Sequence, residues 1–342
     1  MLRASLFRGS LLAALTGLVP LAAQSVLVPA SSASVRGTTG LNTLTREQGN
    51  ARTYQFGLAA SQLAGIPGGS VINGMSFRMA VSSANPAVWP SADVNFADYE
   101  IRIGEALPIT NFSDSFQGNY LQTPQLVRDG ALVMPAAKWT NTSSLPSPQA
   151  NPIADFYFDF QVPYFYAGGD LAITIAHTGS GATNSAYFDA IPSSPASGFT
   201  ALSANSFSAA TGTSVPFIIP RLHYGYGVGC PGTEGKIPNL VLRANVAAGG
   251  TLHMELANGL PNALSVIGLG LVRTSTALPS GCTLLNNLDV TLFSALDGRG
   301  QAVYELVTVP GIPFPFYSQG GVFDPTSLLG YTLSNGVSPT IL

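Results

Sequence analysis

Charged side chains are scarce in this chain: Asp, Glu, Lys and Arg make up 9% of its 342 residues, against roughly a quarter in an average soluble domain. The 14 basic and 17 acidic side chains give a formal net charge of -3. Without a basic excess, the chain has no electrostatic basis for binding nucleic acid or an anionic membrane surface. We therefore expect neither as a partner.

Long apolar runs are scarce too. The run from Leu11 to Leu21 (LLAALTGLVPL) is too short to span a bilayer. Arg3 and Arg8 precede it and Ala22-Ala23-Gln24 follows it, an arrangement typical of a secretory signal peptide. We predict a signal peptide at 1–23 and a mature chain that is secreted, extracellular or at the cell surface, without a membrane span. A retained N-terminal anchor is the alternative.

Long helices are not expected, because the chain holds 37 Gly and 25 Pro, which interrupt helices and favour turns. Hydrophobic residues make up 46% of the chain, enough for a core of short strands. The length favours two domains, and glycines crowd one stretch, 225–235. We predict an all-β fold with two β-sandwiches, jelly-roll-like at 24–224 and immunoglobulin-like at 225–342.

The clearest strand pattern lies at 155–162 (DFYFDFQV). Strict alternation predicts a half-buried strand. Phe156, Phe158, Phe160 and Val162 would face inward, whereas Asp155, Tyr157, Asp159 and Gln161 would face solvent.

Turn signals predict two hairpins, because Asp-Gly favours tight reversals between paired strands. One would pair two short strands within 125–134 around Asp129-Gly130, and the other would pair 289–295 with 301–309 around Asp297-Gly298. The Ser-, Ala- and Pro-rich stretch 188–215 is predicted to be mainly surface loop.

The two cysteines are Cys230, in the Gly-rich stretch, and Cys282, in a Pro279-Ser280-Gly281 turn. In an oxidising compartment, two cysteines are more often paired than free. We predict a Cys230–Cys282 disulfide, with two unrelated buried thiols as the alternative.

Recognisable catalytic motifs are missing. Gly179-Ser180-Gly181 lacks the spacing of a nucleophile elbow, and His177, His223 and His253 lie too far apart for the usual zinc motifs. Asp155 and Asp159 would stand about 13 Å apart on one strand face, too far for glycoside hydrolysis. We predict no catalytic site and a non-enzymatic protein.

Calcium is the one cofactor left open. Asp93, Asn95, Asp98 and Glu100 cluster at the start of a predicted strand, and oxygen ligands suit this ion. The D-x-[DN]-x-[DN]-G pattern of a calcium loop is missing, and a polar loop entering a strand has the same composition.

Only two tryptophans occur, Trp89 and Trp139, and both are expected in loops of the first domain. An exposed indole can stack on a sugar ring, so one or both are a possible ligand platform, with Tyr120 as a third. In the alternative, which we favour, each indole folds inward and closes an open end of the sandwich.

The stretch from 221 to 240 carries a resemblance. It contains Tyr224-Gly225-Tyr226-Gly227-Val228-Gly229-Cys230-Pro231-Gly232-Thr233 and then Ile237-Pro238-Asn239-Leu240. This is similar to the YGxGCxGTxGxxPxL signature that opens a C-terminal domain in secreted two-domain proteins, many of them from planctomycetes. Gly169-Asp170-Leu171 and Leu333-Ser334-Asn335-Gly336 fit the same resemblance, which spans nearly the whole mature chain. It implies two extracellular β-sandwiches, and the family has no established activity to transfer.

Three hypotheses for function follow. The first is a secreted, non-enzymatic structural, adhesion or surface-binding protein whose partners include polysaccharide or cell-surface components. The second is a pair of carbohydrate-binding modules, and the third is an extracellular hydrolase without a recognisable motif. Fold alone does not separate them.

Overall fold

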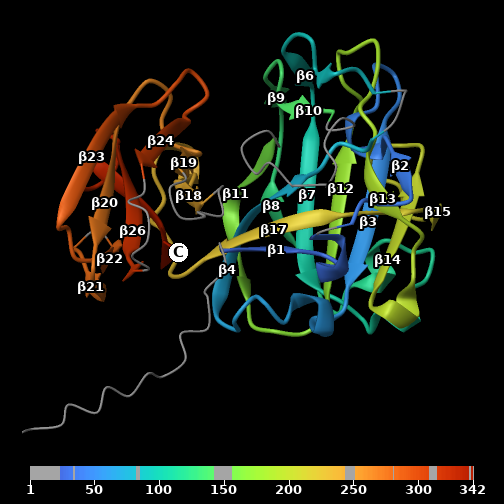
Figure 1. The fold of residues 1–342 in the computed structure, drawn as a ribbon, viewed down its shortest axis with the longest axis horizontal. Coiled ribbons are helices and arrows are strands. Elements are labelled where there is room, and N and C mark those ends of the chain that lie inside the picture. The colour runs from blue at the N-terminus through green and yellow to red at the C-terminus, as the bar shows by residue number, and fades with distance from the viewer. Residues whose placement is uncertain are drawn as a thin grey trace, which may run out of the picture.

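The computed structural model describes residues 24–33, 35–81, 85–141, 156–242, 251–279, 281–307, 314–338 and 340–341. The predicted signal peptide at 1–23 lies outside these residues. The fold is all-β, as predicted: its regular elements are strands, joined by loops and short 3-10 turns. None of the described helical turns is long and apolar enough to cross a membrane. The strands fall into an N-terminal group within 25–225 and a C-terminal group within 239–341 (Figure 1).

In the N-terminal group, two larger antiparallel sheets are described. The first has the order β1 (Ser25–Leu27), β17 (Pro220–Gly225), β4 (Ser70–Phe77), β11 (Tyr157–Tyr166). The second has the order β15 (Thr213–Ser214), β14 (Phe199–Ala204), β3 (Arg52–Leu58), β12 (Leu171–His177), β7 (Tyr99–Glu105), β8 (Gln125–Arg128). Smaller sheets are β16 (Phe217–Ile218) with β13 (Phe188–Ile191) and β2 (Thr39–Leu41), β10 (Trp139–Thr140) with β5 (Val88–Trp89), and β6 (Val94–Phe96) with β9 (Leu132–Met134).

In the C-terminal group, one described sheet has the order β18 (Asn239–Leu242), β19 (Thr251–Ala257), β24 (Ala302–Val307). The other has the order β23 (Val290–Ala295), β20 (Leu264–Gly270), β26 (Tyr317–Phe323), β27 (Tyr331–Val337). Two pairs complete the group: β21 (Arg273–Ala277) with β22 (Thr283–Asn286), and β25 (Phe314–Pro315) with β28 (Thr340–Ile341). The 3-10 turns of the chain are η1 (Ala30–Ala33), η2 (Thr43–Thr45), η3 (Ala60–Leu63), η4 (Ile109–Asn111), η5 (Gln117–Asn119), η6 (Pro195–Ser197) and η7 (Thr233–Gly235).

The buried apolar side chains form two large clusters that match these groups. One runs from Val28 to Leu222 and the other from Leu240 to Val337. Burial of such side chains is the main favourable contribution to folding. The predicted domain bounds, and the jelly-roll and immunoglobulin-like topologies, stay predictions.

Strand β11 and the preceding Phe156 confirm the predicted inward face only in part. Phe156, Phe158 and Phe160 are buried as predicted, but Val162 is 40% exposed, so its predicted inward position is wrong, because the alternation breaks where β11 shifts register against β4. On the other face, Tyr157 and Asp159 are buried too. Asp159 accepts a hydrogen bond from the Arg128 guanidinium at 3.3 Å. The prediction that Asp159 faces solvent is therefore wrong, because this face of β11 is covered and an ion pair compensates the buried charge. Asp155 lies outside the described residues.

The two predicted hairpins are also wrong. Strands β8 and β9 flank Asp129-Gly130, but β8 pairs with β7 and β9 pairs with β6. Strands β23 and β24 flank the Asp297 turn, yet β23 pairs with β20 and β24 with β19. In both places the chain reverses and enters another sheet.

The stretch 188–215, predicted to be mainly loop, contains β13, β14 and β15. Strand β14 pairs along its length with the buried strand β3, and Ala201 in it is fully buried. Small side chains such as Ala201 therefore occupy strand positions in β14, because tertiary packing overrides their weak strand propensity.

A buried polar network joins the two groups. The Asn73 side chain donates to the Leu240 carbonyl at 3.0 Å, and Tyr157 donates to the Asn73 carbonyl at 2.7 Å. Asn335 accepts from the Leu240 N–H at 3.0 Å and donates back to its carbonyl at 3.0 Å. Asn239 donates to Tyr157 at 3.1 Å. Buried amides bonded in this way fix the relative position of the elements that they join.

Candidate functional site

The tryptophans lie inside the N-terminal group. Trp89 and Trp139 are opposed across the β5–β10 pair and are 1% and 0% exposed. Trp89 donates its indole N–H to Asn184 Oδ1 at 3.1 Å, and Trp139 donates to the Phe77 carbonyl at 2.8 Å. The possible ligand platform on these residues is therefore wrong, and the inward-facing alternative is confirmed. Each ring buries a large apolar area while its single donor finds an acceptor.

Tyr120 is not an exposed platform either. It is buried, and its hydroxyl lies 2.7 Å from Thr174 Oγ1. Gly104 approaches its ring so closely that a Cβ there would stand 3.1 Å from Tyr120 Cδ1. No face of the ring is open to stack on a sugar.

His177 has a structural environment. Its Nδ1 accepts the Gly179 N–H at 3.0 Å, so Nε2 carries the hydrogen and donates to the Thr43 carbonyl at 2.7 Å. The ring stacks on Tyr99 with centroids 5.4 Å apart. Burial lowers the pKa of His177 to about 4, because the charged form would lose its hydration. The neighbouring Ser180 is buried, and its hydroxyl accepts the Ala182 N–H at 3.2 Å.

The other two histidines lie apart from His177 in the fold. His223 is buried on β17, where its Nε2 lies 3.0 Å from Ser76 Oγ. His253 is on β19, with Nδ1 3.4 Å from a carboxylate oxygen of Glu305. Among the described residues, no group of three metal-ligating side chains includes a histidine.

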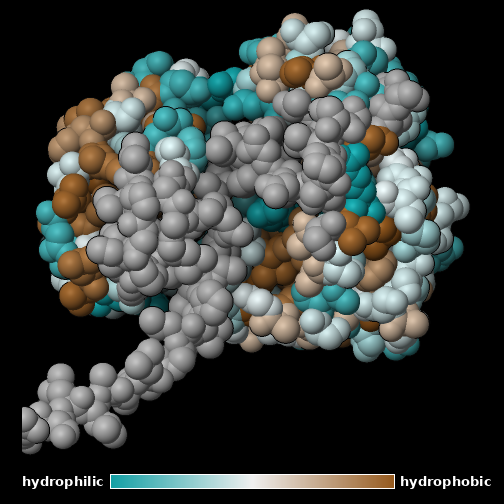
Figure 2. Space-filling view, in the orientation of Figure 1, coloured by the Kyte–Doolittle hydropathy of each residue, from teal (hydrophilic) through white to brown (hydrophobic). Residues whose placement is uncertain are grey.

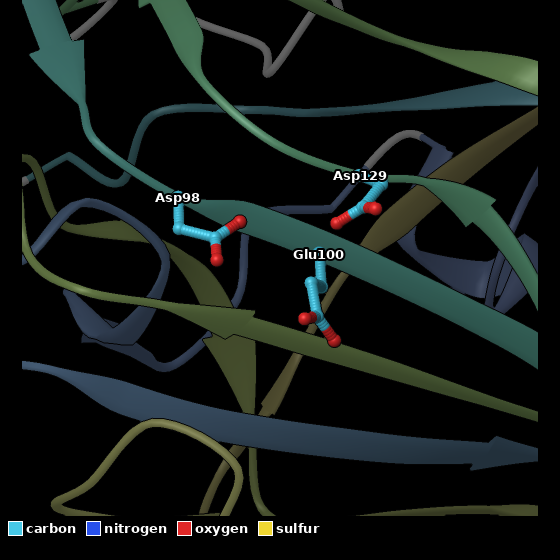
Figure 3. Close-up of side chains that lie close together, drawn as sticks. All are labelled: Asp98, Glu100 and Asp129. Atoms are coloured by element: carbon cyan, nitrogen blue, oxygen red, sulfur yellow. The ribbon is translucent and has the colours of Figure 1, made fainter.

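A carboxylate cluster forms where β7 begins. Ligand oxygens of Asp98, Glu100 and Asp129 lie within 4.8 Å of one another (Figure 3). Asp98 and Glu100 belong to the predicted calcium cluster, and Asp129 joins them from the turn after β8. Asp93 does not belong to this group of three carboxylates. Its side chain accepts a hydrogen bond from the Ala136 N–H at 2.8 Å. Asn95 is exposed on β6.

The three carboxylates differ in their partners. Glu100 is ion-paired with Arg102 at 2.8 Å, and Asp129 accepts the N–H of Gly130 at 2.9 Å. One oxygen of Asp98 is buried without a hydrogen-bond partner among the described atoms. If each carboxylate binds through one oxygen, the cluster supplies three of the six to eight oxygens that calcium takes, so further ligands would be needed to complete a coordination shell.

The predicted disulfide is present between Cys230 and Cys282, with Cα atoms 5.0 Å apart. It ties the Gly-rich stretch to the turn between β21 and β22. Leu278 and Leu284, on either side of Cys282 in the sequence, contribute to the lining of an apolar groove. The disulfide therefore anchors a segment that contributes to this lining.

This groove lies on the outer face of the β23–β20–β26–β27 sheet and has a volume of about 390 Å³. Phe293 opposes Val266, which opposes Gly321, and Gly321 opposes Leu333. Since Gly321 has no side chain, the row is hollow at its centre. The lining residues include none with a charge.

Large apolar side chains project from the same face. Leu264, Phe293 and Phe323 are 54%, 67% and 56% exposed, and Figure 2 shows hydrophobic residues gathered along the outer margin of the C-terminal group. We call this surface, made of Leu264, Val266, Phe293, Phe323 and Leu333, the apolar face. Contiguous exposed apolar surface of this kind marks interaction sites.

A polar cleft of about 210 Å³ lies between the two groups. Arg128, Gln161, Lys236, Asn258 and Arg299 contribute to its lining. Each cation has its own carboxylate: Arg128 pairs with Asp159, Lys236 with Glu234 and Arg299 with Asp297. The cleft is therefore rich in hydrogen-bonding groups and close to neutral.

The apolar face was not found from the sequence. A signal was present, because β20 (LSVIGLG) carries apolar residues at both odd and even positions. Such a strand is either buried on both sides or exposes one apolar side. Only the arrangement of the sheets shows that this side of β20 is covered near Gly268, by Asn286 and Leu288, and left exposed at Leu264.

No protein-family model matches the chain, and no curated protein matches it significantly.

Proposed function

We propose that this chain is a secreted, non-enzymatic structural or surface-binding protein that binds through the apolar face of its C-terminal group. The observation that carries the proposal is the row of exposed Leu264, Phe293 and Phe323 beside an uncharged groove. Contact between these apolar side chains and water is unfavourable. A binding partner that covers them is therefore stabilised roughly in proportion to the apolar area that it removes from water.

The partner of this face is an uncharged protein surface. A charged side chain placed against the groove would lose its hydration without finding an opposite charge among the lining residues. The disulfide beside the groove is consistent with an oxidising, extracellular location. His177 and Ser180 support a non-enzymatic role, since their polar atoms are used in structural hydrogen bonds.

Carbohydrate binding is the second candidate function. The polar cleft between the groups favours it, because Arg, Asn and Gln side chains are suited to hydrogen-bond sugar hydroxyls. Trp89, Trp139 and Tyr120 give it no support, since their rings are buried.

The test measures retention of the purified protein on cell-surface fractions and on polysaccharides. Phe323→Lys and Leu264→Lys place a charge on the apolar face and should lower retention on the cell-surface fraction at least tenfold. Phe165→Lys is the matched control, because Phe165 is 57% exposed on β11 of the other group. Unchanged retention of both face variants contradicts the proposal, as does turnover of any substrate. Retention on polysaccharide that is lost in Arg299→Ala, at a partly exposed residue of the cleft lining, favours the cleft.

A further inference from the structure

Strand β23 is an open edge of the sheet that carries the apolar face. It pairs with β20, and no other described strand pairs with it. Figure 1 places it at the outer margin of the molecule, on the side away from the N-terminal group. Edge strands present unpaired backbone groups that can bind another strand.

The hydrogen-bond pattern between β20 and β23 shows which backbone groups of β23 point away from β20. Leu296 donates its N–H to the Ala263 carbonyl at 2.9 Å, and these two residues continue the register in which Leu264 opposes Ala295. Hydrogen-bonded pairs alternate along an antiparallel ladder, so Leu292 and Ser294 turn toward β20. Thr291, Phe293 and Ala295 therefore turn their N–H and carbonyl groups outward.

This edge lacks the usual protection against strand pairing. The sequence of β23, VTLFSA, contains no charge and no proline, which are common protective features at edges. By contrast, β24, at the edge of the other sheet in this group, carries the exposed Glu305.

The carboxylates beside β23 are already engaged. Asp289 accepts hydrogen bonds from the Leu271 N–H at 3.0 Å and the Asn287 amide at 2.6 Å. Asp297 is ion-paired with Arg299 at 3.0 Å. Both carboxylates can therefore keep these hydrogen-bond and ion-pair partners when another strand pairs with β23.

We propose that β23 pairs antiparallel with β23 of a second copy of this chain, about a twofold axis at Phe293. Thr291 then opposes Ala295 of the partner subunit, and the outward N–H and carbonyl groups of the two strands bond to one another. The two four-stranded sheets become one, and the apolar face continues across the contact. This inference goes beyond the proposed function, because the pairing extends the apolar face and leaves it open to a cell-surface partner.

The uncharged surface is what favours a second copy over a different protein. A twofold axis brings identical groups together, so a charge at Phe293 would meet its like. In this register Asp289 comes opposite Asp297 at each end, where Asp297 is already ion-paired with Arg299. Between Val290 and Ala295 no such repulsion arises, and Phe293 meets Phe293 of the partner subunit in a directly opposed aromatic pair, an arrangement that stabilises antiparallel strands.

Sedimentation equilibrium of the purified protein tests the pairing from about 1 to about 100 μM, the range of micromolar affinities. The unmodified chain should be dimeric at the upper end. Thr291→Pro removes an outward N–H but no bond to β20, and Phe293→Lys places a charge at the axis. Both should raise the dissociation constant at least tenfold, whereas Phe165→Lys should leave it unchanged.

A monomer at the highest concentration overturns the pairing, and so does a dimer that both β23 variants leave intact. Circular dichroism and the unfolding midpoint check that the variants fold, which the 67% exposure of Phe293 leads us to expect. Retention on the cell-surface fraction separates the two proposals. A monomer whose retention is lost in Phe323→Lys overturns the pairing alone, whereas a dimer without surface retention overturns the proposed function alone.

Discussion

Trp89 and Trp139 face each other across the β5–β10 pair with ring centroids 5.5 Å apart. Trp139 also packs edge-on against Phe188, with centroids 5.1 Å apart. Two residues separated by 50 positions thus form the centre of an aromatic cluster that stabilises the fold. Replacing one of these tryptophans therefore tests how much the aromatic cluster contributes to the free energy of unfolding.

Trp139→Ala should lower the free energy of unfolding by about 3–5 kcal/mol, as expected when a buried aromatic ring is removed. Phe165→Ala, at an exposed ring, should cost less than about 1 kcal/mol. Denaturant unfolding measures both, and acrylamide should quench the native tryptophan fluorescence weakly. Strong quenching together with an unchanged midpoint for Trp139→Ala would contradict burial.

Removal of the disulfide should also destabilise the chain. The Cys230–Cys282 bond closes a loop with a sequence separation of 52, for which the chain-entropy account gives about 4 kcal/mol. The double variant Cys230→Ser with Cys282→Ser should lose about that much, measured by denaturant unfolding. Non-reducing peptide mass spectrometry of the unmodified protein is the control, and two free thiols there would contradict the assignment.

Acid should destabilise the fold through His177. Its pKa is about 4 when folded against an ordinary value of 6.5, so between these values only the unfolded chain takes up the proton. The contribution of His177 to the free energy of unfolding is therefore fully present above pH 6.5. It is lost as the pH drops, by up to about 3 kcal/mol below pH 4.

The slope of stability against pH checks this prediction. His177→Gln removes the titrating group, so the part of the slope between pH 4 and 6.5 that comes from this residue should disappear. His253→Gln is the matched control, because His253 is on the C-terminal group and beside Glu305. Equal slopes in the unmodified chain and in His177→Gln would show that another group is responsible.

Calcium should bind the Asp98, Glu100 and Asp129 cluster no tighter than about 0.1–1 mM, the range of weak extracellular sites. Among the residues that the structure describes, three carboxylates converge there, and Glu100 is already ion-paired with Arg102. Isothermal titration calorimetry of the unmodified chain and of Asp98→Asn measures the affinity. Micromolar binding that is lost in Asp98→Asn would show that further ligands complete the site.

Local sequence patterns determined the strand content and much of the core. Alternation placed Phe156, Phe158 and Phe160 inside, and all three are buried. Gly and Pro content excluded long helices, and the two cysteines were paired correctly. These features depend on the residues themselves and on their immediate neighbours, so a single sequence is enough to predict them.

Long-range packing decided the rest. The turns at Asp129-Gly130 and Asp297-Gly298 reverse the chain, as their sequences predict. Whether the two flanking strands then pair with each other depends on which other strands of the fold lie next to them. Trp139 lies inside because Phe77 and Phe188 come to it from distant strands, and Asp159 can be buried because Arg128 arrives on β8. The apolar face is exposed at Leu264 and Phe293 because the segment that contains β22 packs on the same side of β20 only near Gly268. Each outcome depends on contacts between residues far apart in the sequence, and only the tertiary structure brings those residues together.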